Sequence, residues 1–152
     1  MRGLTLLELL VTLSIMAILL TLGVTSFSGF FDKRRLAQAT EQVYSDLQWA
    51  RMSAMQFNNS VTVSLSGEGS ANWGYVISGA VSKSVTGIAE ITFANSSFSS
   101  DAVTFQAAGG AANTGTIRLV SAGNDELRIV VSGRGRVRIC DANNSMTDYE
   151  AC

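Results

Sequence analysis

The chain has 152 residues, a net charge of −1 and no histidine, which excludes histidine triads, histidine general bases and histidine metal sites. Its length allows one domain with an extension, and a charge near zero gives no global field to attract nucleic acid or a membrane surface. No Cys/His cluster has metal-ligand spacing. We therefore expect no cofactor, no metal site and no enzymatic activity.

The N-terminal segment is apolar from Leu4 to Phe31, and Glu8 is its only charged side chain. As a helix, residues 9–31 would extend about 35 Å, enough to cross a hydrocarbon core. An ionisable group inside such a segment is costly and usually functional. A cleaved secretory signal fits poorly because the run is long and contains Glu8. A plain membrane anchor fits the length but gives Glu8 no role.

The run Gly3-Leu4-Thr5-Leu6-Leu7-Glu8-Leu9-Leu10 closely resembles the class III signal of type IV pilins and type II secretion pseudopilins. The resemblance implies that residues 1–3 are a leader peptide, removed by a prepilin peptidase that cuts after Gly3. The same enzyme would methylate the new N-terminus at Leu4, where the family usually has Phe. Glu8 would then act in assembly by pairing with the freed ammonium of Leu4, because a buried carboxylate needs an opposite charge.

Beyond residue 35, apolar or small residues recur at alternating spacings of four and three, the period of one helix face: Leu36, Thr40, Val43, Leu47, Ala50 and Ala54. We expect a single helix from about Leu4 to Gln56. Its residues 4–31 would be embedded in the membrane or filament core, and its second half would be amphipathic and pack on a globular head, residues 32–152. Tyr44 and Trp49 are expected in the core rather than in a subunit contact.

Short strand-like runs follow the helix, separated by clusters of Gly, Ser and Asn: Val61–Leu65, Gly74–Ser78, Glu90–Phe93, Val103–Gln106, Thr116–Val120, Leu127–Val131 and Arg134–Ile139. Residues 122–125 predict a hairpin connection. The fold class is α+β, with a long N-terminal helix covering one face of an antiparallel β-sheet head. With the leader resemblance, this arrangement implies the pilin fold.

The C-terminal half resembles a narrower family, the GspH/FimT group of minor pilins, through a scattered set of residues: Phe105, Gly109, Gly115-Thr116-Ile117, Arg128-Ile129-Val130-Val131-Ser132 and Gly133-Arg134-Gly135-Arg136-Val137-Arg138. That group includes the type II secretion pseudopilin H and the minor pilins FimT and FimU. The resemblance implies a single-pass inner-membrane protein with its head in the periplasm. It would assemble with other pilins or pseudopilins into a filament.

The only two cysteines, Cys140 and Cys152, lie near the C-terminus. In an oxidising compartment they would close a short loop and stabilise the head by about 3 kcal/mol. Because the apolar segment sends the head out of the cytoplasm, we expect a disulfide rather than two unrelated thiols.

A basic patch is predicted between positions 118 and 138, where five arginines fall: Arg118, Arg128, Arg134, Arg136 and Arg138. The last three alternate, so on a strand all of them would face one side. Gly133 and Gly135 lack side chains beside these arginines and would let a large polyanion approach the backbone.

The Gly-Arg-x-Arg element resembles the DNA-binding stretch of FimT proteins in naturally transformable bacteria. It implies a type IV minor pilin that captures double-stranded DNA for uptake through phosphate contacts, which give affinity without sequence choice. No aromatic residue interleaves the arginines, so duplex binding fits better than base stacking.

The alternative is a structural subunit without DNA binding, either pseudopilin H of a type II secretion system or a FimU-like minor pilin that primes pilus assembly. The arginines would then pair with an adjacent subunit or with Asp141, Asp148 or Glu150.

Overall fold

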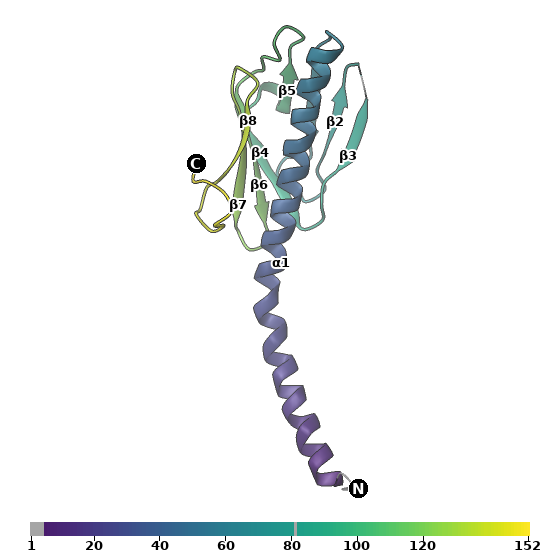
Figure 1. Cartoon of the computed structure of the whole chain (residues 1–152), viewed down its shortest axis with the longest axis vertical. Coiled ribbons are helices and arrows are strands. Elements are labelled where there is room, and N and C mark those ends of the chain that lie inside the picture. Colours follow the sequence, from purple (N-terminus) through teal and green to yellow (C-terminus); the bar gives the residue numbers. More distant parts are fainter. Residues whose placement is uncertain (1–4, 81) are drawn as a thin grey trace. The chain divides into compact units, whose positions relative to one another are not determined.

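The computed structural model describes residues 5–80 and 82–152, with the backbone alone described for residues 21–28. Gly3 and Leu4, the predicted sites of cleavage and methylation, lie outside the described residues. The chain divides into two compact units, Met1–Phe31 and Asp32–Cys152. The helix α1 and most of the strands are labelled in Figure 1.

A single helix, α1 (Leu6–Gln56), forms the N-terminal third of the chain, as the periodicity predicted. It begins at Leu6 because Thr5 caps it, with the Glu8 backbone N–H donating to the Thr5 hydroxyl at 3.2 Å. The spacing Thr-x-x-Glu is that of a capping box. The helix ends where Asn58 takes a left-handed φ of 47° and the Asn59 N–H donates back to the Ala54 carbonyl at 3.2 Å.

The described side chains of the first unit are exposed, and most of them are apolar, for example Leu6 at 82% and Leu19 at 64%. A contiguous apolar surface of this kind marks an interaction site. Within the part of the chain that the structure describes, no helix meets the length and hydropathy needed to cross a membrane.

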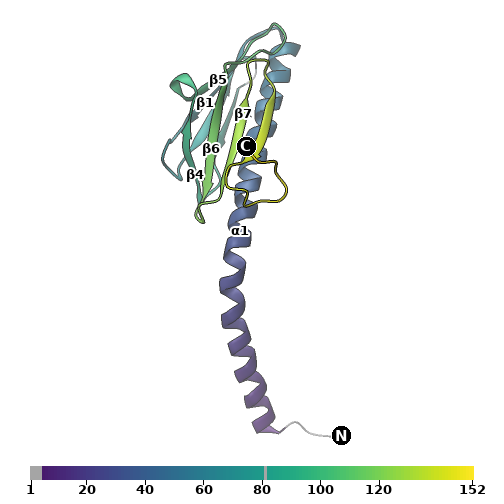
Figure 2. The same cartoon turned by 90° about the vertical axis from the view of Figure 1, so that its left-hand side faces the viewer.

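The second unit holds two four-stranded antiparallel sheets, seen from two sides in Figures 1 and 2. Sheet A has the strand order β3-β2-β1-β5, and sheet B has the order β4-β6-β7-β8. Their bounds are β1 Val61–Ser66, β2 Gly74–Ser78, β3 Lys83–Thr86, β4 Ile91–Ser96, β5 Ala102–Phe105, β6 Gly115–Ser121, β7 Glu126–Val131 and β8 Val137–Asp141. A short 3₁₀ turn, η1 (Ser99–Asp101), precedes β5.

The structure confirms the α+β fold and differs from the predicted strands at three points. The head has two sheets rather than one, because β4 joins sheet B while β5 returns to pair with β1 in sheet A. Strand β3 was not predicted, since Lys83–Thr86 contains one apolar residue and is largely exposed. Strand β8 begins at Val137 rather than at Arg134.

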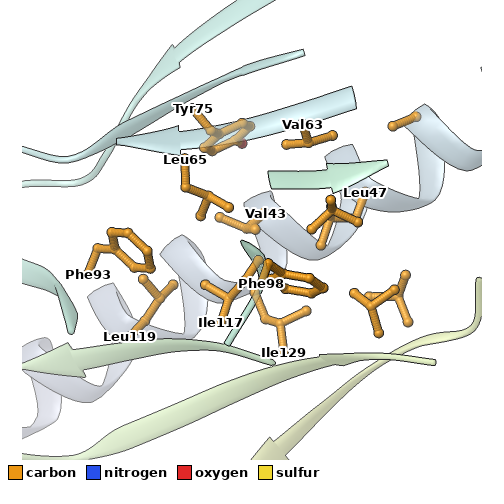
Figure 3. Packing of buried hydrophobic residues seen from close by; sticks show 14 of the residues in the cluster. Val43, Leu47, Val63, Leu65, Tyr75, Phe93, Phe98, Ile117, Leu119 and Ile129 are labelled. Atoms are coloured by element: carbon orange, nitrogen blue, oxygen red, sulfur yellow. The ribbon is translucent and has the colours of Figure 1, made fainter. Parts of the chain in front are cut away.

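The core lies entirely within Asp32–Cys152. The predicted helix stripe, from Leu36 to Ala54, is buried to 0–1% exposure. In Figure 3, side chains from both sheets meet Val43 and Leu47 of α1. Tyr44 and Trp49 pack partly buried against this core. Because the unit contains its own complete core, we expect it to fold alone.

One polar cluster ties sheet A to the helix. Asp46 of α1 is 8% exposed and accepts hydrogen bonds from Tyr75 Oη at 2.7 Å and from Lys83 Nζ at 2.6 Å. Burial, and then the hydrogen bond to Asp46, raises the pKa of Tyr75 far above its usual value. Tyr75 therefore stays protonated and keeps donating to the carboxylate.

Candidate functional site

The Gly-Arg-x-Arg element forms the turn between β7 and β8. The Ser132 N–H donates to the Arg136 carbonyl at 2.9 Å, and the Gly135 N–H donates to the Ser132 carbonyl at 2.8 Å. Gly135 has a φ of +70°. This is a three-residue hairpin loop that ends in a left-handed glycine.

This turn corrects the prediction that three arginines alternate along one strand. Arg134 lies within the loop and Arg136 closes it, so only Arg138 belongs to β8, opposite Val130. The three residues are still brought together by the hairpin. Together with Gly133 they line one open hollow of about 880 Å³, whose other lining residues are Arg51, Val130 and Ser132.

The three arginines are exposed, and none of their side chains forms an ion pair among the described residues. The acids that the alternative pairs with them, Asp141, Asp148 and Glu150, form no ion pair with them among the described residues. Asp141 instead accepts hydrogen bonds from the backbone N–H of Asn143 at 2.9 Å and of Met146 at 2.7 Å. The hollow thus carries positive charge without an internal counter-ion.

The two glycines of the turn differ in what they require. Gly135 is buried and left-handed, and a Cβ there would overlap the carbonyl oxygen of Gly110. Gly133 is exposed, and a Cβ there would make only an ordinary contact with the Thr114 methyl group. Gly135 is therefore required by the packing of the turn, whereas Gly133 leaves open space beside the arginines.

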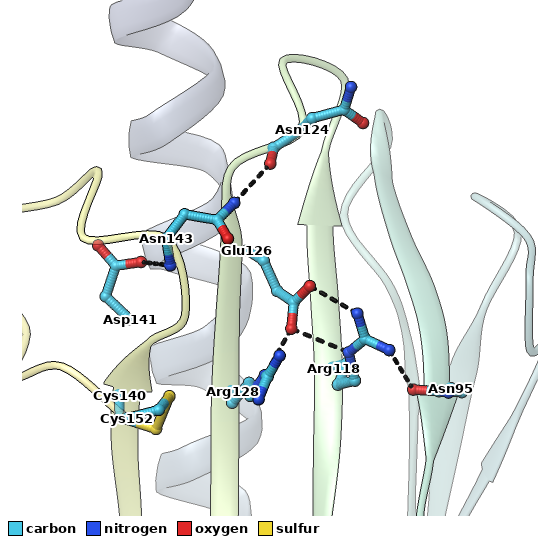
Figure 4. Close-up of polar contacts among 9 residues, drawn as sticks. All are labelled: Asn95, Arg118, Asn124, Glu126, Arg128, Cys140, Asp141, Asn143 and Cys152. Carbon is cyan, nitrogen blue, oxygen red and sulfur yellow. Dashed lines mark hydrogen bonds and ion pairs between the residues drawn. A yellow bond between two sulfur atoms is a disulfide. The ribbon is translucent and has the colours of Figure 1, made fainter.

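Arg118 and Arg128 lie outside the hollow, so the predicted five-arginine patch is divided. They face each other across β6 and β7, and both bind Glu126, as Figure 4 shows. Arg118 donates twice, at 2.9 and 2.7 Å, and Arg128 Nε donates at 2.5 Å. The hydrogen bond from Arg118 lowers the pKa of Glu126 against the opposing effect of burial, and Arg128 adds to the lowering. One ionised carboxylate therefore neutralises part of the charge of this pair.

Arg51 is a member of the hollow that the sequence did not indicate. It lies on α1, 83 residues before Arg134, and its Nη2 donates to the Arg134 carbonyl at 3.3 Å. The only signal in the sequence is a single basic residue near the end of the helix, which fits a solvated position equally well.

The predicted disulfide between Cys140 and Cys152 is present, with a Cα–Cα distance of 5.0 Å. It ties the C-terminal segment, residues 142–152, to the end of β8. There the Cys152 N–H donates to the Asp141 carbonyl at 3.0 Å. The segment also reaches α1, because Tyr149 Oη donates to Glu41 Oε1 at 2.9 Å.

Glu8 is exposed in the first turn of α1. Its predicted partner, the ammonium of Leu4, lies outside the described residues, so the pairing stays a prediction. The position favours a carboxylate in any case, because the N-terminus of a helix carries partial positive charge.

Comparison with known protein families supports these features. Residues 1–24 match the prokaryotic N-terminal methylation motif, and residues 39–146 match the model of the type II transport protein GspH. No curated protein and no solved structure matches the chain.

A methylation motif that includes the start of one long helix, together with an antiparallel β head, defines the class of pilin-like filament subunits. The chain belongs to the GspH family within that class, as a GspH/FimT-like minor pilin. The family implies processing by a prepilin peptidase and assembly with other pilins.

Proposed function

We propose that this minor pilin assembles into a type IV pilus through its N-terminal helix and binds double-stranded DNA for uptake through its arginine hollow. We define the arginine hollow by Arg134, Arg136 and Arg138. The N-terminal segment would anchor the chain in the inner membrane, with the head in the periplasm, until assembly.

The observation that carries the DNA proposal is three exposed arginines around one hollow, without an acidic partner among the described residues. A guanidinium group presents several N–H donors in a planar fork that matches phosphate oxygens. The described residues that line the hollow include no aromatic residue, which favours contacts to a duplex backbone over base stacking. Such contacts would give affinity without sequence preference.

The assembly proposal rests on the first unit. Its described apolar side chains are exposed and need a lipid or protein environment. The methylation motif covers this segment. The exposed carboxylate of Glu8 would then be matched by an N-terminal ammonium, its own or that of a neighbouring helix.

The test is binding of the head, residues 32–152, to duplex DNA across a salt series. Three phosphate contacts predict a log–log salt slope of about −2 to −3. The triple variant Arg134→Gln/Arg136→Gln/Arg138→Gln should lose binding. The control Lys33→Gln/Arg34→Gln/Arg35→Gln removes the same charge elsewhere on the head and should retain binding.

The second candidate is a structural subunit, a type II secretion pseudopilin H or a FimU-like minor pilin. The observation that favours it is the family match itself, which is described as a type II transport protein. In that case the arginines would contact a neighbouring subunit. A wild-type head that binds no duplex at any salt concentration would support this candidate and sink the DNA proposal.

A further inference from the structure

Arg51 connects the helix to the turn that carries two of the three arginines. Its Nη2 donates to the carbonyl oxygen of Arg134, at the tip of the loop, over 3.3 Å. Among the described residues, no other α1 side chain forms a hydrogen bond to this turn. The contact acts on the backbone of the turn rather than on an arginine side chain.

The stem of Arg51 fills the space where two glycines meet. A Cβ on Gly110 would lie 3.1 Å from Arg51 Cγ, and a Cβ on Gly135 would lie 3.0 Å from Arg51 Nε. Both glycines are left-handed, with φ of +65° and +70°. The side chain is therefore fitted tightly against the loop that contains Gly110 and against the turn of β7 and β8.

The Nε atom of Arg51 is buried and has no hydrogen-bond partner among the described residues. A buried donor without an acceptor is destabilising. An apolar side chain of similar length would fill this space without that cost, so packing alone does not explain an arginine here. What the guanidinium adds is the hydrogen bond to Arg134 and a place in the wall of the hollow.

We infer that Arg51 is a positioning residue of the DNA site: it holds the turn so that Arg134, Arg136 and Arg138 face one hollow. This inference rests on the proposed DNA binding. The arginines that line the hollow then have two different roles. The side chains of Arg134, Arg136 and Arg138 contact phosphates, whereas Arg51 acts through the backbone of the turn.

The experiment measures duplex binding by the full-length chain in detergent across a salt series. Arg51→Leu removes the donor to the Arg134 carbonyl, whereas Arg51→Lys keeps an N–H donor on a side chain nearly as long as that of arginine. We expect Arg51→Leu to weaken binding roughly tenfold at each salt concentration, and Arg51→Lys to retain most of the affinity. The slope should stay near that of the wild type in both variants. Arg136→Gln, by contrast, should make the slope shallower by about 0.9.

Two further measurements serve as controls. Arg35→Gln removes a positive charge from the same helix, where the side chain is paired with Glu90, and should bind DNA like the wild type. Amide NMR spectra without DNA should show shifts at Gly135 and Arg136 in Arg51→Leu, while the rest of the head is unchanged. If Arg51→Leu unfolds the head, Arg51→Met, an apolar side chain closer in length to arginine, replaces it and should weaken binding by the same factor.

The outcomes separate the inference from the function on which it rests. A wild-type chain that does not bind the duplex overturns the proposed function and the inference with it. Wild-type binding combined with unchanged affinity in Arg51→Leu overturns the inference alone. A slope that becomes shallower by about 0.9 in Arg51→Leu also overturns it, because Arg51 would then contact a phosphate directly.

Discussion

Gly135 determines the shape of the turn on which the arginine hollow depends. Its φ is +70°, and the carbonyl oxygen of Gly110 occupies the place of a Cβ. Gly133, two residues earlier, has neither constraint. Substitutions at Gly133 and Gly135 can therefore be compared within one loop.

We predict that Gly135→Ala lowers the free energy of unfolding of the head by about 2–3 kcal/mol, because it adds left-handed strain and a steric overlap. It should also weaken duplex binding by displacing Arg134 and Arg136. Gly133→Ala should change stability by less than about 0.5 kcal/mol. Urea unfolding followed by tryptophan fluorescence measures both, and equal stabilities for the two variants would refute this account of the turn.

Glu126 has a different role on the same sheet. It is 8% exposed and lies beside two arginines that face each other across neighbouring strands. Like charges directly opposite each other destabilise a sheet, and the carboxylate between them removes that repulsion. Arg118 and Arg128 are therefore less available to a phosphate than the exposed arginines of the hollow.

The lowered pKa of Glu126 predicts a dependence of stability on pH. A carboxyl group with a lowered folded pKa contributes stability above its ordinary value of 4.5, and this contribution is lost as the pH falls through the folded pKa. Glu126→Gln should destabilise the head by about 1–2 kcal/mol near neutral pH, since both arginines are partly solvated. The difference from wild type should shrink as the pH falls below 4.5. A difference that stays constant over this range would argue against the pairing.

Among the elements of the head, the C-terminal segment that follows β8 is tied down by two contacts near its end. The disulfide joins Cys140 at the end of β8 to Cys152, and Tyr149 reaches Glu41 of α1. Burial and this hydrogen bond raise the pKa of Tyr149 above its usual value, so its hydroxyl remains a donor. The segment thereby fixes the end of the strand that carries Arg138.

We predict that Cys140→Ser/Cys152→Ser lowers the free energy of unfolding by about 3 kcal/mol, the chain-entropy value for a loop of this length. The measurement is denaturant unfolding of the head with and without reductant. Reductant should destabilise the wild type by a similar amount and leave the variant unchanged. A variant as stable as the oxidised wild type would show that the hydrogen bonds alone hold the segment.

At the scale of the whole molecule, the two units carry different parts of the function. The first unit presents exposed apolar side chains and Glu8, and the second holds the complete core and the hollow. Assembly and DNA binding should therefore be separable by mutation.

Glu8→Ala should leave membrane insertion and leader cleavage intact but block incorporation into filaments, because the N-terminal ammonium of a neighbouring helix would lose its partner. Immunoblots of membranes and of purified filaments measure the two steps. The conservative variant Glu8→Asp serves as the control and should retain part of the incorporation. Normal amounts of Glu8→Ala in purified filaments would count against the predicted role.

Local sequence patterns predicted the elements well. The stripe from Leu36 to Ala54 follows the helical period, and all of its residues are buried. The alternation in β1 and β7 likewise follows from one buried face. These elements were predictable because their burial follows a short period in the sequence, three or four residues in the helix and two residues in the strands.

What the sequence did not indicate depends on distant contacts. The pairing of β1 with β5, which produces the second sheet, joins residues about 40 positions apart. Arg51 joins the hollow only through a turn 83 residues later. The alternation of the last three arginines suggested one strand. Gly135 instead takes a left-handed conformation in a turn that packs against the Gly110 carbonyl, a contact between residues distant in the sequence.

We propose that the arginine hollow binds DNA and is not needed for assembly. The decisive experiment measures filament number and DNA uptake in native cells that carry Arg134→Gln/Arg136→Gln/Arg138→Gln in place of the wild type. We expect normal filaments that contain the variant, together with loss of DNA uptake. Unchanged uptake, or loss of the filaments themselves, would contradict it, because the arginines would then be dispensable for DNA or would act as subunit contacts.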